Sequence, residues 1–127
     1  MTGHRAVLVD VDGTITAPTF DAIDLETLTG ALDVRYVDCV QVRPLKRDRA
    51  VTLDAWVDDE GLFNSPPNPV ASQLIAVLSE RPCQQLYGRV LLAACDHATG
   101  ESIGLSAENQ EGLVAMGGLL ARLLARV

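Results

Sequence analysis

The strand-forming runs of this chain are joined by connections that are too short for a parallel sheet. Residues 6–9 are followed by the β-prone triplet 14–16, and the Asp-Gly pair between them is a hairpin signal. The runs 34–42 and 51–57 are also close in sequence. Parallel neighbours need a crossover of about a dozen residues or more, usually containing a helix. The sequence therefore predicts an α+β fold with a mostly antiparallel sheet.

Three helical segments are expected to pack on this sheet. Asp24 can cap a helix whose Leu25, Leu28 and Leu32 form one apolar stripe. Asn68 caps the next helix, which has Pro69 at its first position. Its apolar face consists of Val70, Leu74, Val77 and Leu78. Residues 90–95 and 102–105 then form a second hairpin, and 107–127 a final helix, so the predicted order is ββαββαββα.

Composition limits the class of protein. The 127 residues carry 17 acidic and 10 basic side chains, a formal net charge of −7, and we expect a single domain over residues 1–127. The negative charge disfavours binding to duplex nucleic acid, whose phosphates need basic side chains. Residues 2–5 are polar and the C-terminal apolar stretch contains Arg122 and Arg126. We therefore expect no secretion signal, no membrane span and a cytoplasmic location.

The three cysteines, Cys39, Cys83 and Cys95, lie far apart in apolar or mixed runs. Their odd number and their spacing match neither a disulfide framework nor a zinc site. We expect them to be buried free thiols in a reduced compartment.

The run from Ala6 to Ile15 contains Asp10-Val11-Asp12-Gly13-Thr14 after an apolar strand. This resembles the first motif of the haloacid-dehalogenase-like phosphohydrolases. The resemblance implies Asp10 as nucleophile, Asp12 as acid/base and Mg²⁺ as cofactor, with both carboxylates near the metal. That family also needs a later lysine and an acidic pair after a parallel strand. Here Lys46 is the only lysine, and Asp58-Asp59 follows it by only 12 residues. The alternative is that Asp-Gly makes a turn and the chain has no catalytic or metal-binding residues there.

A second resemblance covers roughly residues 5 to 105. An N-terminal strand ends in Asp-Gly, a Leu-x-x-Leu helix is followed by an acidic-Gly turn at 59–62, Asn68-x-x-Ala71 opens a helix, and Tyr87-Gly88-Arg89-Val90 leads a strand. This layout is similar to the family called domain of unknown function 3846, and residues 105–127 lie outside it. The resemblance implies a protein of a phage, plasmid or other mobile element, with no established activity.

Two further features suggest binding. Arg43, Lys46, Arg47 and Arg49 place four basic residues within seven positions, and such a cluster can hold a small anionic ligand or an acidic partner. Trp56, the only tryptophan, and Phe63 flank the turn 58–61 and could wall a small pocket for that ligand. The alternative is that these two of the five aromatic residues belong to the core.

The C-terminal segment offers a second surface. Leu113, Met116, Leu120, Leu123 and Val127 are spaced 3-4-3-4, and Leu119 and Leu124 widen this stripe. We expect either a core helix or a homodimer in which Leu120 and Leu123 lie near the interface and Gly117 allows close approach.

These observations favour a small non-enzymatic accessory protein of a mobile element, which binds a protein partner or a small anionic ligand. The alternative is a Mg²⁺-dependent phosphohydrolase that uses Asp10 and Asp12.

Overall fold

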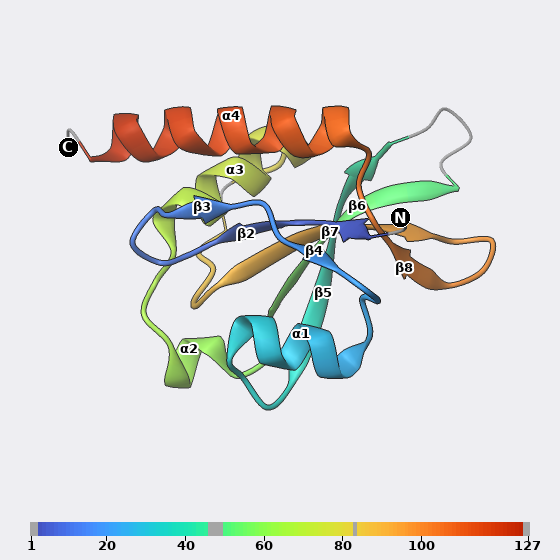
Figure 1. The fold of residues 1–127 in the computed structure, drawn as a ribbon. Coiled ribbons are helices and arrows are strands. Elements are labelled where there is room, and N and C mark those ends of the chain that lie inside the picture. Colours follow the sequence, from blue (N-terminus) through green and yellow to red (C-terminus); the bar gives the residue numbers. More distant parts are fainter. Residues whose placement is uncertain (1–2, 46–49, 83, 126–127) are drawn as a thin grey trace.

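The computed structural model describes residues 3–45, 50–82 and 84–125. Helices separate three groups of strands along the chain (Figure 1). The strands are β1 (His4–Arg5), β2 (Val7–Val9), β3 (Ile15–Thr16), β4 (Thr19–Phe20), β5 (Val37–Pro44), β6 (Val51–Asp58), β7 (Val90–Asp96) and β8 (Glu101–Ile103). The helices are α1 (Leu25–Leu32), α2 (Gly61–Asn64), α3 (Pro69–Ser79) and α4 (Ala107–Leu124).

The main sheet has the strand order β3-β2-β7-β6-β5. The eighth strand, β8, pairs with the C-terminal residues of β7, on the same side of β7 as β2. Every pairing in it is antiparallel. A small ribbon of β1 and β4 lies beside it. The predicted α+β class with a mostly antiparallel sheet is therefore confirmed. The element order is more complex than predicted, because β1, β4 and the one-turn helix α2 were not expected from the sequence.

Helices cover both faces of the sheet (Figure 1). On one face, α3 and α4 pack on alternate side chains of the central strands, including Val9, Leu53 and Leu92. On the other face, α1 packs through Leu28 and Leu32 on a smaller core. Leu25 departs from the expected stripe, because it is exposed in the first turn of α1. Val77 of α3 is also exposed, at the margin of a stripe that buries Val70, Ala71, Leu74 and Leu78.

The first hairpin forms where the Asp-Gly pair predicted it. Val9 pairs with Ile15 and Leu8 with Thr16. The Asp10 N–H donates to the Thr14 carbonyl at 2.9 Å, and the Gly13 N–H donates to the Asp10 carbonyl at 3.0 Å. Gly13 has φ +89°, a left-handed conformation that glycine adopts without steric cost. The turn therefore accounts for the Asp-Gly pair by backbone geometry alone.

Asn68 holds α3 against two strands. Its side chain is completely buried, and its Nδ2 donates to the Val9 carbonyl at 3.0 Å and to the Gly88 carbonyl at 2.9 Å. Its Oδ1 accepts from the Ala71 N–H at 3.1 Å as the helix N-cap. One side chain thus satisfies groups at the end of β2, at the entry to β7 and in the first turn of α3.

Gly117 lets α4 lie close to the sheet rather than to a partner. A Cβ added at this buried glycine would lie 2.5 Å from Ile15 Cδ1. Leu120 is half-buried and packs on the same core. The close approach that Gly117 allows is therefore made within the chain, whereas a dimer interface at or near Leu120 and Leu123 stays a prediction.

We predict that Asn68→Ala lowers the free energy of unfolding by about 3 kcal/mol, because it removes a helix cap and leaves two buried carbonyls without donors. Urea unfolding followed by circular dichroism measures this loss. Asn64→Ala is the matched control, since Asn64 is exposed and its replacement should change stability by less than about 0.5 kcal/mol. Equal stabilities of the two variants would contradict the role given to Asn68.

Candidate functional site

The polar residues at one end of the sheet meet because of the position of β7. Both β2 and β6 are antiparallel to β7 and lie on either side of it. The carboxyl ends of β2 and β6 therefore lie at the same end of the sheet, on either side of the start of β7. This arrangement brings Asp10 after β2 and Asp58 at the end of β6 to the same end of the sheet as Arg89.

Asp10 and Asp12 both make bonds that support the turn. Asp10 Oδ1 accepts from the Val11 N–H at 2.7 Å, and Asp10 Oδ2 lies 3.3 Å from Arg89 Nε in a partly exposed ion pair. Asp12 Oδ1 accepts from the Thr14 N–H at 2.9 Å. Hydrogen bonds from Thr14 lower the pKa of Asp12, so this exposed carboxyl is ionised near neutral pH. The hydrogen-bonding groups of both residues serve the hairpin and its link to β7.

Asp58 fixes the connection that leads into α2. Its Oδ1 accepts from the Glu60 N–H at 2.9 Å, and its Oδ2 accepts from the Ser65 hydroxyl at 3.1 Å. A Cβ at Gly61 would lie 2.9 Å from the Tyr87 carbonyl oxygen. Asp58 therefore joins the two residues that flank α2, Glu60 and Ser65, while the first residue of α2, Gly61, packs against the segment before β7.

The geometry gives no support to phosphoryl chemistry at Asp10 and Asp12. Both neighbours of β2 in the sheet, β3 and β7, are antiparallel, whereas the resemblance implies parallel neighbours. Lys46 lies outside the described residues. Within residues 3–45, 50–82 and 84–125, no group of three or more His, Cys, Asp or Glu side chains could hold a metal ion.

The expected anion site is not assembled around Trp56. Arg43 pairs with Leu53 and lines a cavity of about 350 Å³ beside α3 and α4. Trp56 pairs with Leu91 and lines a separate cavity of about 520 Å³ beside α1. The two residues therefore lie on opposite faces of the sheet and line different cavities. Lys46, Arg47 and Arg49 lie outside the described residues.

A β-bulge explains why Arg43 is on that face. The register of β5 on β6 shifts between Gln41 and Arg43, so Val42 is an extra residue. Strict alternation would put Gln41 and Arg43 on one face, but one inserted residue reverses the faces that follow it.

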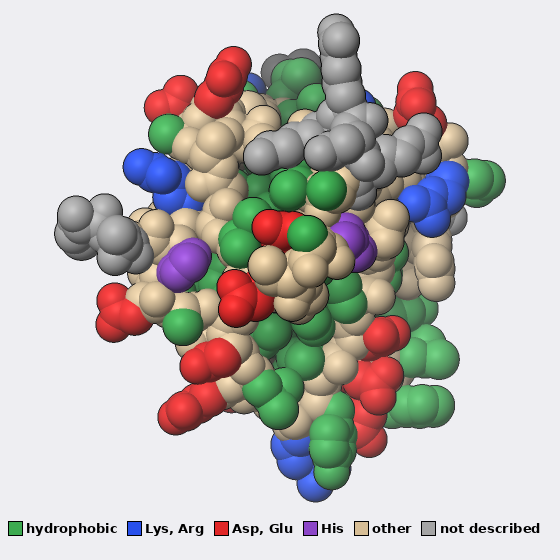
Figure 2. Space-filling model, turned by 90° about the vertical axis from the view of Figure 1, so that its right-hand side faces the viewer, with side chains coloured by type: hydrophobic (Ala, Val, Ile, Leu, Met, Phe, Trp, Pro, Cys, Tyr) green, Lys and Arg blue, Asp and Glu red, His purple; other side chains and the backbone are tan. Residues whose placement is uncertain are grey.

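The Trp56 cavity has an acidic and apolar lining. Its walls come from the start of α1, from β1 and from β8. Figure 2 shows this side of the molecule, where acidic side chains lie on both sides of a strip of hydrophobic ones. Among the described residues, the indole Nε1 of Trp56 is buried without a hydrogen-bond partner, so packing alone holds the ring in place.

The described cysteines are free, but Cys39 is exposed and Cys95 is only partly buried, which corrects the expectation that both are buried. Desolvation of the sulfur and the nearby charge of Asp54 raise the pKa of Cys39 to about 12. Desolvation, followed by the charge of Asp54, also raises the pKa of Cys95. Both groups are therefore protonated thiols at neutral pH, and thiols are poor nucleophiles. Cys83 lies outside the described residues.

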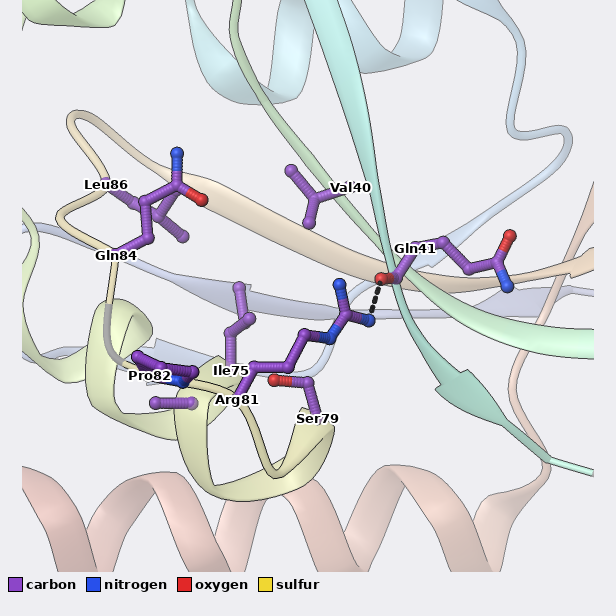
Figure 3. Close-up of a pocket in the computed structure, with 9 residues that line it drawn as sticks. Val40, Gln41, Ile75, Ser79, Arg81, Pro82, Gln84 and Leu86 are labelled. Carbon is purple, nitrogen blue, oxygen red and sulfur yellow. Dashed lines mark hydrogen bonds between the residues drawn. The ribbon is translucent and has the colours of Figure 1, made fainter.

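The outer strand β5 borders a smaller cavity of about 200 Å³ (Figure 3). Val40, Ile75 and Leu86 contribute apolar walls. Arg81 extends from the segment after α3 and donates through Nη2 to the Gln41 carbonyl at 3.0 Å and the Val42 carbonyl at 3.3 Å.

Side chains also protect this strand edge. Asp38 Oδ1 accepts from the Cys39 N–H at 2.8 Å, and Pro44 at the end of β5 has no N–H. Charged side chains, a bulge and proline are the usual means of preventing a sheet edge from pairing with another chain. We therefore do not regard β5 as a docking edge.

Comparisons with known proteins add no relatives: no family model, no curated protein and no solved structure matches the chain. In the described part of the chain, none of the helices has the length and apolar character needed to cross a membrane.

The sequence did not single out Leu62 of α2, and Phe63, expected in a pocket wall or in the core, lies on the surface instead. Their side chains are 66% and 85% exposed. The segment has four residues, too few for a helical periodicity to be visible. The available signal was the position of two large apolar residues directly after the acidic turn 58–61.

Proposed function

We propose that this chain is a small non-enzymatic accessory protein that binds a protein partner through α2. The assignment to a phage, plasmid or other mobile element rests on the resemblance to the domain of unknown function 3846 family, and the assignment to the cytoplasm rests on the free cysteines. That resemblance depends on short motifs and remains a prediction. The binding role is supported by one observation, the outward presentation of Leu62 and Phe63.

Leu62 and Phe63 are suited to contact a partner because their backbone is already held in place. Asp58 bonds both the Glu60 N–H and the Ser65 hydroxyl, and Gly61 lies against the Tyr87 backbone. A side chain on a fixed backbone loses less conformational entropy when it binds. Large apolar side chains that enter a partner's pocket supply much of the affinity of many interfaces.

The surroundings of α2 indicate the chemistry of the partner. Tyr36 is exposed, and its carbonyl accepts from the Asp59 N–H at 3.1 Å, so it lies beside the turn that precedes α2. Asp59 is exposed, and Glu60 Oε1 lies 3.8 Å from Arg35 Nη2 in an ion pair on the surface. This surface, formed by Tyr36, Asp59, Glu60, Leu62 and Phe63, is the α2 surface. It fits a partner with an apolar pocket bordered by basic side chains.

A small anionic ligand is the less favoured alternative. Among the described residues, only Arg43 of the basic stretch could contribute to it. Arg43 shares its cavity with the carboxylate of Glu108, which opposes the binding of an anion.

We predict that Phe63→Ser weakens partner binding at least tenfold without unfolding the protein, because an exposed apolar anchor contributes to binding and little to stability. The measurement is affinity capture with quantitative mass spectrometry from bacteria that carry the source element. Val77→Ser is the matched control, since Val77 is an exposed apolar residue on α3.

The expected result is a protein retained by the wild type and by Val77→Ser but lost with Phe63→Ser. Equal recovery with all three proteins would contradict the α2 surface as the binding site. Thermal denaturation of each variant shows whether a loss comes from unfolding.

We also propose a homodimer through α4. The side of α4 that faces away from the sheet carries Ala115, Met116, Leu119 and Leu123, all of them exposed. In the part of the chain that the structure describes, no other helix or strand lies over this outer side (Figure 1). An exposed apolar stripe on a helix commonly marks a protein interface.

We predict a molar mass near twice the 13.6 kDa of the monomer in light scattering at high micromolar concentration. Leu123→Glu should give a folded monomer, because Leu123 is 48% exposed within one chain. Leu62→Glu is the control, since it changes an exposed leucine away from α4. A wild-type mass of 13.6 kDa would rule out the dimer.

A further inference from the structure

The outer side of α4 carries opposite charges at its two ends. Glu108 and Glu111 lie in the first two turns of the helix and Arg122 lies in its last turn, and all three are exposed. Glu111 and Arg122 also lie on the same flank of the apolar stripe, because eleven residues make about three turns of an α-helix. The surface of the helix is therefore acidic at one end, apolar in the middle and basic at the other end.

Neither Glu111 nor Arg122 forms an ion pair within its own copy. The two residues are about 16 Å apart along the helix axis, which is farther than their side chains reach. In residues 3–45, 50–82 and 84–125, the ion pairs are Arg35–Glu60 and Arg89–Asp10. Both charges of α4 are thus available to a second molecule.

The residues between these charges are spaced symmetrically about one point of the helix. Met116 and Leu119 are equally far from the middle of the segment, and so are Gly112 and Leu123. A Cβ added at Gly112 would meet no atom within 4 Å, so the surface is open at that position. The outer side therefore offers a large side chain at one end and room for one at the other.

We propose that two copies associate through α4 in an antiparallel, two-fold arrangement in which Glu111 of each copy pairs with Arg122 of the other. This arrangement rests on the homodimer proposed above and specifies which residues of the two copies meet. In antiparallel helices, residues at equal distances from a common midpoint face each other. Leu119 then packs on Met116 of the other copy, and Leu123 lies over the open surface at Gly112. The two-fold axis repeats every contact.

A parallel arrangement would not satisfy the same charges. Residues with the same number lie at the same height in a parallel two-fold pair. Glu111 would then be level with Glu111 of the other copy, and Arg122 with Arg122. Like charges placed near each other oppose association, so the distribution of charge favours the antiparallel arrangement.

The interface is separate from the α2 surface. In Figure 1, α4 and α2 lie on opposite sides of the sheet. The dimer therefore leaves the α2 surface of each copy free, and the arrangement does not depend on whether Phe63 binds a partner.

The test is the dimer dissociation constant of the full-length protein, measured by sedimentation equilibrium for the wild type and three charge variants. Glu111→Lys and Arg122→Glu each place two pairs of like charges in the antiparallel interface, so each should weaken the dimer about threefold to tenfold. The double variant Glu111→Lys/Arg122→Glu exchanges the charges and keeps the net charge of −7. Its dissociation constant should lie within about twofold of the wild-type value, because every pair is again of opposite sign.

The double variant also separates pairing between copies from damage to the helix. Lysine near the start of a helix and glutamate near its end both oppose the helix dipole, so a loss caused by weakening α4 would be larger in the double variant than in either single one. Circular dichroism checks that each variant is folded. Asp21→Lys is the control for net charge, since Asp21 is exposed in the segment before α1 and its replacement changes the charge as Glu111→Lys does. This control should leave the affinity within about twofold of the wild type.

The possible failures are distinguishable. A wild-type protein that stays monomeric at high micromolar concentration would overturn both the homodimer and the arrangement. A wild-type dimer that neither single change weakens, or that the double change fails to restore, would overturn the antiparallel arrangement and leave the homodimer standing.

Discussion

The buried side chain of Asn68 is the interaction on which the arrangement of this fold depends. Its amide nitrogen bonds carbonyls at the end of β2 and before β7, and its oxygen caps α3. No apolar side chain could replace it, because each of these backbone groups is removed from water and needs a partner. The same segment contains Ser72, whose hydroxyl accepts from the Leu86 N–H at 2.9 Å. The helix and the chain before β7 are therefore joined by polar contacts as well as by the core.

The consequence for function is that polar residues at this end of the sheet are used by the fold. Asp10 bonds the hairpin and Arg89, and Asp58 bonds the turn before α2. A carboxylate pair after a strand thus has the sequence of a catalytic motif, while its hydrogen bonds are those of a turn. Large apolar side chains are exposed elsewhere, on α2 and on the outer side of α4.

Local signals in the sequence predicted much of the fold. The Asp24 and Asn68 caps and the Asp-Gly turn depend on interactions within a few residues, and each forms where it was expected. The candidate sites depended on side-chain direction, which the sequence did not specify. One extra residue near Val42 moves Arg43 to the face opposite Trp56. A glycine at position 117 weakens the helix in isolation, but the close contact with Ile15 leaves no room for a Cβ there. Ile15 is about a hundred residues away along the chain, so the sequence alone does not reveal this contact. Such contacts become visible only when the strands are paired.

The central claim is that Asn68 clamps the strand ends, and hydrogen exchange of its side-chain amide tests it most directly. In a ¹⁵N-labelled sample, both Nδ2 hydrogens should exchange with solvent as slowly as the backbone amides of β7, because both are bonded within the core and are released only by global unfolding. The exposed side-chain amide of Asn64 supplies the rate of an unprotected group. Exchange of the Asn68 hydrogens at the rate of Asn64 would contradict the clamp.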